Sequence, residues 1–212
     1  MWFPFWKKKK TAPLVLPGQW VLVPLGNPGI EYADTRHNLG RLMVQRWMDR
    51  HCQSAEAIHS FCYGKAYSLV APLIATMAMV ALVPSTYMNL SGKSVAEAVR
   101  LGFPLQQMLV VYDDKDLPLG TGRLSKDGGS AGHKGLNSII DELGTDAILR
   151  LRLGIGPFQR PLHDWVLEAW TQEEWGAIEK MDAPFATAMS ILSEGLPVVE
   201  LQNRINAPGF WR

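Results

Sequence analysis

Short apolar runs of strand length alternate with stretches of helical periodicity along this chain. The apolar runs lie at Gln19–Leu25, Met108–Tyr112 and Leu149–Ile155. Helical spacing is clearest over residues 38–50, where Leu39, Met43 and Trp47 recur every four residues. Buried strands that alternate with helices form parallel sheets with helices on their faces. The pattern therefore predicts a single-domain α/β fold with a twisted mixed, largely parallel sheet flanked by helices.

Turn and capping signals place the other elements. We expect strands at 61–70, 74–83 and 120–124, and helices at 94–101, at 136–143 and from Thr171 onward. The first two of these strands are expected to form a hairpin around Ala71-Pro72. The arginines of the strand at 149–155 are expected to point outward, and those of the helix at 38–50 (Arg41, Arg46 and Arg50) to be solvated charge.

Length and composition favour one folded domain behind an N-terminal extension. The chain has 212 residues, of which 47% are hydrophobic and 19% charged, so it can bury a substantial core. Residues 1–18 are rich in proline, contain the run Lys7–Lys10 and show no periodicity. We therefore expect a flexible extension at 1–18 and a single α/β domain over 19–212.

Charge and cysteine content exclude several classes of protein. The net charge is +1, so a polyanionic partner would meet a local patch and not a strongly basic surface. Two cysteines, Cys52 and Cys62, rule out a disulfide scaffold and suit a reducing compartment. The longest apolar run, 69–83, contains Pro72 and is shorter than a membrane span. We expect a cytoplasmic protein that does not contact a membrane.

Polar residues follow the expected buried strands in four segments, at the sheet edge where α/β proteins bind ligands. The segments are 26–29 together with 35–38, 86–93, 112–118 and 128–136. Taken singly, each is also typical of an ordinary turn, helix start or mobile loop. Asp113, Asp114 and Asp116 have no histidine or glutamate at ligand spacing nearby in the sequence, so no metal site is expected.

Five motifs in a fixed order carry a family resemblance. They are Leu25-Gly-Asn-Pro-Gly29 with Tyr32 and Thr35-Arg-His-Asn38, Thr86-Tyr-Met-Asn-Leu-Ser-Gly-Lys93, Asp113 with Asp116-Leu-Pro118 and Gly120, Gly132-His133 with Gly135-Leu136, and Arg150-Leu-Arg-Leu-Gly-Ile-Gly156. Together they resemble the bacterial-type peptidyl-tRNA hydrolase family from about Trp20 to about Asn206. Members of that family fold as a single α/β domain with a twisted mixed sheet.

The resemblance implies an enzyme without metal or other cofactor. Its reaction would be hydrolysis of the ester between a peptide and the 3′-terminal ribose of tRNA, which recycles peptidyl-tRNA released from stalled ribosomes. The catalytic histidine falls on His37 and its aspartate partner on Asp113. The expected substrate-binding residues are Asn27, Tyr32, Tyr87, Met88, Asn89 and Lys134. The expected partner is the tRNA acceptor end with its peptide backbone; no obligate protein partner is expected, and the protein is expected to be a monomer.

Several residues near the motifs bear on the tRNA and on the rate. The resemblance places a grip on a terminal tRNA phosphate near Lys126 and Arg152, with Arg123 as a substitute, although a solvated sheet face explains these charges equally well. Lys134 stands where the family usually has asparagine, which is thought to help hold the attacking water. Pro24 replaces a usual glycine in the first strand, which favours an edge position or a local bend.

The residues themselves favour a water-activating base. A neutral imidazole is the natural base near pH 7, and a carboxylate that accepts its other N–H fixes the tautomer. No nucleophile elbow is expected, and both cysteines lie outside the four segments. The alternative is an RNA-binding protein on the same scaffold that has weakened or lost catalysis, which Lys134 favours. A small-molecule esterase is disfavoured because the chain shows no sign of an apolar acyl pocket.

Overall fold

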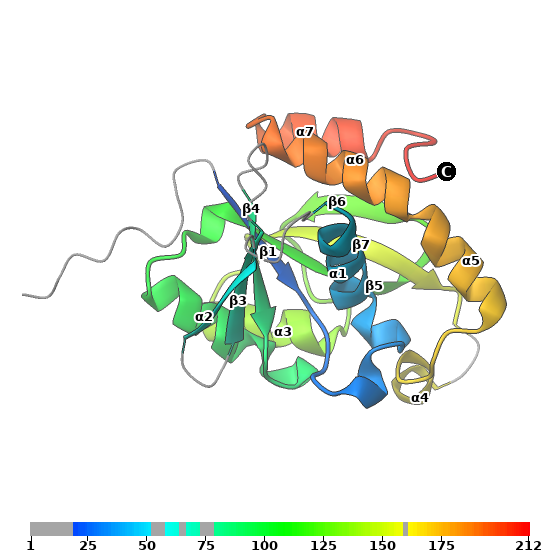
Figure 1. The fold of residues 1–212 in the computed structure, drawn as a ribbon, viewed down its shortest axis with the longest axis horizontal. Helices are drawn as coiled ribbons and strands as arrows, with labels where there is room; N and C mark the ends of the chain where they lie inside the picture. Colours follow the sequence, from blue (N-terminus) through cyan, green and yellow to red (C-terminus); the bar gives the residue numbers. More distant parts are fainter. Residues whose placement is uncertain (1–18, 52–57, 64–66, 73–78, 159–160) are drawn as a thin grey trace, which may run out of the picture.

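A seven-stranded mixed sheet organises the computed structural model, which describes residues 19–51, 58–63, 67–72, 79–158 and 161–212. The sheet order is β2-β3-β4-β1-β5-β7-β6 (Figure 1). The strands are β1 (Trp20–Pro24), β2 (Ile58–Tyr63), β3 (Tyr67–Pro72), β4 (Met79–Pro84), β5 (Met108–Pro118), β6 (Gly122–Lys126) and β7 (Leu149–Gly156). The expected extension at 1–18 lies outside the described residues.

The four central strands, β4, β1, β5 and β7, run parallel, and antiparallel strands complete the sheet on both sides. This confirms the predicted mixed, largely parallel sheet. The predicted hairpin around Ala71-Pro72 is wrong, because both residues belong to β3, which pairs with β2 and with β4. Three strands occupy the stretch where the apolar pattern indicated two, since that pattern does not mark where one buried strand ends and the next begins.

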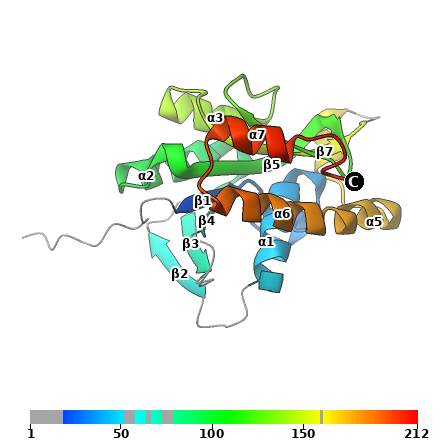
Figure 2. The ribbon, with the colours of Figure 1, turned by 90° about the horizontal axis from the view of Figure 1, so that it is seen from above.

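Helices cover both faces of the sheet (Figure 2). They are α1 (Leu39–His51), α2 (Ser91–Arg100), α3 (Lys134–Leu143), α4 (Leu162–Val166), α5 (Gln172–Lys180), α6 (Asp182–Ser193) and α7 (Val198–Ile205), with short 3₁₀ turns η1 (Ile30–Tyr32), η2 (Arg36–Asn38), η4 (Met88–Leu90) and η5 (Leu105–Gln107). One core lies between the sheet and α1, α6 and α7, and the other between the sheet and α2 and α3. None of the helices in these ranges is long and apolar enough to cross a membrane.

The predicted helices are present with shifted ends. Gly144 adopts a left-handed conformation (φ 66°) and ends α3. Thr171 caps α5 through a reciprocal capping box with Glu174, which satisfies backbone donors at the helix start. The helix that begins there ends at Lys180, and α6 follows at once, so the single long helix expected from Thr171 is two helices.

Two central strands depart from the sequence prediction in a way that shapes the site. β5 was expected to end at Tyr112, but it continues through the aspartates to Pro118, so Asp113 lies on a strand and not in a loop. Pro24 was expected at a sheet edge or at a local bend. The edge position is wrong, because β1 is central, and Pro24 is the last residue of this strand, where a missing backbone N–H costs least. The chain then turns toward α1. Gly40 of this helix packs so closely against β5 that an added Cβ would lie 2.2 Å from the Val111 carbonyl oxygen.

Candidate active site

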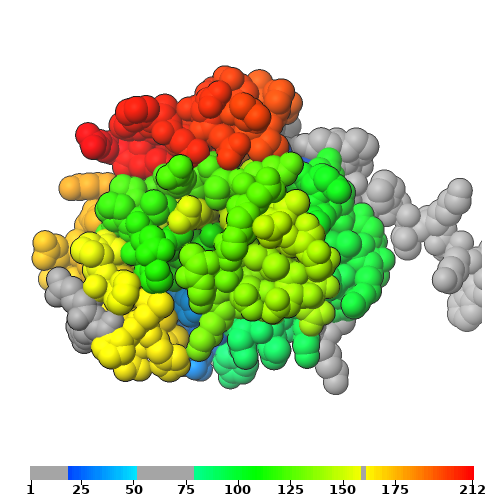
Figure 3. Space-filling view, turned by 180° about the vertical axis from the view of Figure 1, so that it is seen from behind, coloured from blue at the N-terminus to red at the C-terminus, as the bar shows by residue number. Residues whose placement is uncertain are grey.

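A cavity of about 540 Å³ opens at the carboxyl ends of β1, β4 and β5. Figure 3 shows the hollow between the yellow surface around α4 and the yellow-green surface of α3 and its preceding loop. All but three of the sequence-predicted site residues line it. The residues of that set in its walls are Asn27, Tyr32, His37, Tyr87, Met88, Asn89, Asp113 and Lys134. The three that do not line the cavity are the expected phosphate contacts.

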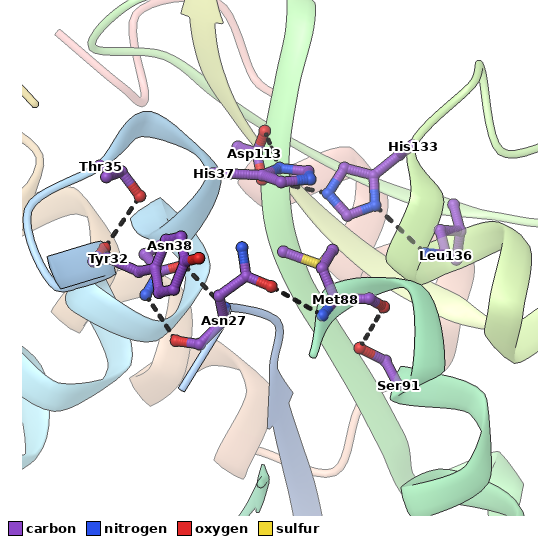
Figure 4. A network of polar contacts seen from close by, with 10 residues as sticks. All are labelled: Asn27, Tyr32, Thr35, His37, Asn38, Met88, Ser91, Asp113, His133 and Leu136. Atoms are coloured by element: carbon purple, nitrogen blue, oxygen red, sulfur yellow. Dashed lines mark hydrogen bonds and ion pairs between the residues drawn. The ribbon is translucent and has the colours of Figure 1, made fainter. Parts of the chain in front are cut away.

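The deepest polar group in the cavity is a carboxylate between two histidines (Figure 4). Asp113 is 3% exposed, and its two oxygens lie 3.0 and 3.1 Å from Nδ1 of His37. Nε2 of His133 lies 3.0 Å from Oδ1 of the same carboxylate. η2 carries His37, β5 carries Asp113, and His133 caps α3, so three segments far apart in sequence meet here. The predicted pairing of His37 with Asp113 has hydrogen-bonding geometry; the second histidine had no role assigned to it from sequence.

The hydrogen-bond network fixes the tautomer of both histidines. The backbone N–H of Leu136 donates to Nδ1 of His133 at 3.1 Å, so the proton of His133 must be on Nε2, where it donates to Asp113. Because Asp113 can only accept, Nδ1 of His37 carries a proton too. This leaves Nε2 of His37 as the free lone pair of a residue that lines the cavity.

Electrostatics keep the carboxylate ionised and the imidazole basic. Burial alone would raise the pKa of Asp113, but the charges and hydrogen bonds of His37 and His133 hold that pKa well below its usual range. For His37, burial acts in the opposite direction and lowers the pKa, and the positive charge of Lys134 lowers it further. The Asp113 carboxylate outweighs both, so the pKa of His37 is raised above 6.5.

Asn27 is held by the side chain of Asn38 and by the backbone of Met88. Oδ1 of Asn38 accepts from the backbone N–H of Asn27 at 2.8 Å, and Nδ2 of Asn38 donates to its carbonyl oxygen at 3.0 Å. The side-chain Oδ1 of Asn27 accepts from the backbone N–H of Met88 at 2.8 Å. With Oδ1 so occupied, the amide Nδ2 of Asn27 points toward the side of His37 in Figure 4 as a donor for a ligand.

Arg41 supports the same loop and corrects a sequence prediction. Its guanidinium donates to the carbonyl oxygen of Asn27 at 3.1 Å and also to that of Pro84, which ties the loop after β1 to the end of β4. It is therefore not solvated charge. Arg46 differs from the prediction as well, because it is partly buried and forms an ion pair with Asp182 on α6. Arg50 also pairs with Asp182 but is exposed, as solvated charge should be. Helical periodicity showed which side of α1 these residues occupy but not which element packs there.

Aromatic residues line the outer part of the cavity. Tyr32 and Tyr87 meet edge to face with ring centroids 6.4 Å apart, and Tyr87 is 54% exposed. Met88 lies deeper, against Gly135, where an added Cβ would lie 2.5 Å from the Met88 sulfur. Asn89 is exposed at the rim. The motif at 86–93 thus contributes both the wall of the cavity and the N–H that orients Asn27.

A buried arginine next to His37 holds α4 and α5 against the segment that carries His37. Arg36 is 3% exposed, and its Nη2 lies 2.7 and 2.8 Å from the two carboxylate oxygens of Glu174 on α5. Its guanidinium carbon lies 5.0 and 5.4 Å from the ring centres of Trp165 and Trp170. Cation–π contacts and a bidentate ion pair at one buried group fix its neighbours firmly. No role for Arg36 followed from the sequence, although this residue lies inside the motif at 35–38.

The three expected phosphate contacts do not form one group. Arg123 and Arg152 are paired in register on β6 and β7, so they share the α2–α3 face of the sheet with Tyr112. Lys126 pairs with Leu149 and, by strand alternation, belongs to the opposite face. Nε of Arg152 lies 2.5 Å from Oδ2 of Asp114, which lines the cavity.

The arginines of β7 do not both point outward. Arg150 is 2% exposed and donates to the carbonyl oxygens of Gly128 and Gly129 at 2.8 and 3.0 Å, so it anchors the glycine-rich loop. Arg152 is partly buried by its pair with Asp114. The prediction of outward arginines is therefore wrong for Arg150.

The glycine-rich loop contains a spacing that the prediction of no nucleophile elbow did not take into account. Residues 128–132 match the G-x-S-x-G pattern of such an elbow. Ser130 lies midway along the loop that joins β6 to α3, however, and not on a tight strand-to-helix turn. Its hydroxyl oxygen lies 3.3 Å from the N–H of Gly132 and 3.3 Å from Oδ1 of Asn137. Neither of these two partners is a base, so the contacts of Ser130 with the described residues do not supply the activation that a nucleophilic serine needs.

The cluster of His37, Asp113 and His133 is the one set of potential metal ligands that the structure brings together within its described ranges, with ligand atoms within 4.8 Å of one another. Sequence spacing did not foresee it. The set does not fit a metal well, because the ring nitrogens that face Asp113 are both protonated donors. Ligation by His133 through Nε2 would require loss of that proton and of the bond from Leu136.

Comparison with known proteins identifies the family to which the chain belongs. A family model described as peptidyl-tRNA hydrolase matches residues 21–210. The chain belongs to the peptidyl-tRNA hydrolase family. A peptidyl-tRNA hydrolase of Chloroflexus aggregans is 42% identical over 194 residues, which cover 88% of this chain and 98% of the relative. The chloroplastic peptidyl-tRNA hydrolase of Arabidopsis thaliana is 40% identical over 190 residues, covering 87% of this chain and 62% of the relative.

The fold agrees with this family assignment. The crystal structure of peptidyl-tRNA hydrolase from Acinetobacter baumannii superposes with a TM-score of 0.75 at 30% identity, over 90% of this chain and 95% of that one. The family resemblance inferred from the five motifs is confirmed. The family match begins at residue 21, two residues after residue 19, where the α/β domain was expected to start.

Proposed function

We propose that this chain hydrolyses the ester of peptidyl-tRNA with a water molecule that His37 activates. Support comes from one observation above all: the free Nε2 of His37 belongs to a buried ring whose Nδ1–H is held by an ionised carboxylate, in a cavity that also holds the Asn27 amide. The relatives named peptidyl-tRNA hydrolase point to the same reaction.

The proton path follows from the hydrogen bonds. Nε2 of His37 takes a proton from water as the oxygen attacks the ester carbonyl, and the proton passes to the 3′ oxygen of the ribose as the ester bond breaks. Asp113 stabilises the imidazolium that forms in between, without being protonated itself. His133 shares the charge of Asp113 and, through Leu136, attaches the carboxylate to the start of α3. Its role is positioning.

In this proposal, side-chain amides of the site bind the peptide part of the substrate, and cationic side chains bind the tRNA part. The Nδ2 of Asn27 is set to donate to a carbonyl oxygen of the substrate, and Asn89 at the rim can bind a peptide amide group. Tyr32, Tyr87 and Met88 provide surface that any peptide can contact. Arg123 and Arg152 lie on one face of the sheet and are the proposed contacts to a terminal tRNA phosphate; Lys126 would act separately, from the other face. In this proposal a monomer carries the whole site within residues 19–212.

The alternative of a weakened RNA-binding protein loses its main support. Lys134 was its one argument, and Lys134 is an exposed residue at the cavity wall that leaves the pairing of His37 with Asp113 intact. A lysine there can donate a hydrogen bond to water but, when charged, cannot accept one. The expected consequence is a slower enzyme and not an inactive one.

Release of free tRNA from N-acetyl-aminoacyl-tRNA by the purified chain tests the proposal. We expect turnover that is abolished or strongly reduced in His37→Ala and unchanged by a chelator. A protein that binds tRNA but releases none would overturn the proposed function. Inhibition by the chelator that added zinc or magnesium reverses would overturn the metal-free mechanism.

A further inference from the structure

A second cavity adjoins the catalytic one. Its volume is about 440 Å³, and four residues line both cavities: Asn89, Ser130, Gly132 and Lys134. Lys134 therefore lies at the boundary between the two cavities. A chain that occupies the catalytic cavity can continue past Lys134 and Asn89 without crossing the protein interior.

The walls of the second cavity come from η4 and one face of α3. Asn137, Ser138, Asp141 and Glu142 lie on that face, and Leu90 lies opposite. The floor is closed, because α2 and α3 approach so tightly that a Cβ on Gly92 would lie 2.0 Å from the Ser138 carbonyl oxygen. The result is a surface groove with polar walls, set beside a reactive site.

Two hydrogen bonds orient polar groups in the second cavity. Nδ2 of Asn137 donates to Oδ2 of Asp141 at 2.7 Å, and the Ser138 hydroxyl accepts from the N–H of Gly92 at 3.0 Å. Asp141 and Glu142 are both exposed and form no ion pair with the described residues. Lys134 is the one cation among the described residues that line this cavity, against two carboxylates, so the groove is net negative.

Charge decides which half of the substrate fits there. A tRNA end carries a phosphate at every nucleotide, and two exposed carboxylates disfavour it. Apart from Lys134, the cations lie elsewhere: Lys115 lines the catalytic cavity but not the second one, and Arg152 and Arg123 follow on the adjoining strands. The peptide is the half of the substrate that an acidic groove can accept.

We propose that the second cavity is a subsite for the peptide, where residues upstream of the esterified amino acid bind, and that it favours basic side chains. This proposal rests on the proposed function and adds a preference that hydrolysis of the ester does not require. Amide and hydroxyl groups of the groove meet the peptide main chain, and Asp141 and Glu142 meet a lysine or arginine. The enzyme would thus act on all peptidyl-tRNAs but fastest on those with basic peptides.

A series of acetylated tetrapeptidyl-tRNAs, all ending in the same amino acid, tests the subsite. One lysine or one glutamate is placed at each upstream position in turn, and kcat/KM is measured at low salt. We expect at least one position where lysine exceeds glutamate by about fivefold, the upper range for an exposed ion pair. The double variant Asp141→Asn/Glu142→Gln should lose this ratio and retain its activity on N-acetyl-aminoacyl-tRNA. Glu200→Gln, an exposed carboxylate on α7, is the matched control and should keep the ratio.

Three results would overturn the subsite. The first is a lysine-to-glutamate ratio near one at every position, and the second is the same ratio in wild type and double variant. The third is tighter binding of deacylated tRNA by the double variant than by Glu200→Gln, which would place RNA in the groove. A wild-type chain that hydrolyses none of these substrates would instead overturn the proposed function, and the subsite with it.

Discussion

The two walls of the catalytic cavity are built in different ways. On one wall, Asn27, His37 and Asn38 are buried, and hydrogen bonds to the main chain or to a carboxylate hold their side chains. On the other, the loop at 127–132 contains two non-glycine residues at positive φ, Asp127 and Ala131, and most of its residues are exposed. Arg150 anchors its carbonyl oxygens at Gly128 and Gly129, and the remaining hydrogen bonds of the loop run to Asn137 and His133 or stay within the loop.

This difference separates chemistry from substrate selection. Proton transfer needs atoms held within a few tenths of an ångström, which the buried wall supplies. Peptides vary in sequence, so the wall that meets them gains from side chains that can move. Substitutions on the buried wall should therefore reduce the rate strongly, while those on the exposed wall should adjust it. Five predictions test that expectation.

His37→Ala should give the largest loss. Removal of a positioned base lowers turnover by roughly 10²- to 10⁴-fold. Thermal unfolding of the variant serves as the control, because a folded but slow enzyme is expected. Near-normal turnover would mean that another group is the base.

Asp113→Asn should cost less than loss of His37 and should move the pH profile. Wild-type kcat/KM should rise with pH through a pKa above 6.5, since His37 acts in its neutral form and Asp113 raises its pKa. Without that carboxylate, burial and Lys134 lower the pKa of His37, so the acidic limb should move to lower pH. A pH–rate profile measures both effects. An unchanged limb would contradict the assigned contact.

Asn38→Ala tests a residue that only the structure identified. The substitution removes two hydrogen bonds that hold the main chain of Asn27, each with a net contribution of about 1 kcal/mol. We expect kcat/KM to fall by roughly tenfold, with the pKa in the pH–rate profile unchanged because His37 keeps Asp113. Asn137→Ala, on α3 next to Ser130 of the exposed loop, is the comparison and should cost much less. Equal losses would remove the distinction between the walls.

Arg152→Ala should act on tRNA binding. Removal of one phosphate-binding cation should reduce the slope of log K against log salt by about 0.7 to 0.9, with turnover at saturation little changed. Lys126→Ala, on the opposite face of the sheet, reports whether the second face also meets RNA. A collapsed turnover with an unchanged salt slope in Arg152→Ala would show that its pair with Asp114 serves the chemistry instead.

Lys134→Asn should have the smallest effect, and a favourable one. The substitution restores a hydrogen-bond acceptor near the attacking water and removes a charge that lowers the pKa of His37. At pH well above that pKa, turnover should rise a little with unchanged tRNA affinity, while the acidic limb moves to higher pH. A fall in turnover at high pH would make Lys134 a functional adaptation of this chain.

The sequence by itself determined the local elements and the polar segments. Apolar runs specified β1 and β7, spacing of Leu39, Met43 and Trp47 specified α1, and the motif order identified the family. These features depend on residues a few positions apart, whose burial pattern is written in their order. The carboxyl ends of parallel strands meet at one edge, so the sequence also predicted that the four polar segments would lie there, and the family resemblance implied that His37 pairs with Asp113.

Only the tertiary structure decided which groups each polar residue meets. Arg41 and Arg50 lie on the same helix and look alike in sequence, yet one supports the main chain of Asn27 and the other binds Asp182. Lys126 and Arg152 appeared as one phosphate grip, but strand register puts them on opposite faces. His133 shares Asp113 with His37 because α3 starts beside β5. Such contacts join residues tens of positions apart, and no local periodicity records them, because they depend on how whole elements pack.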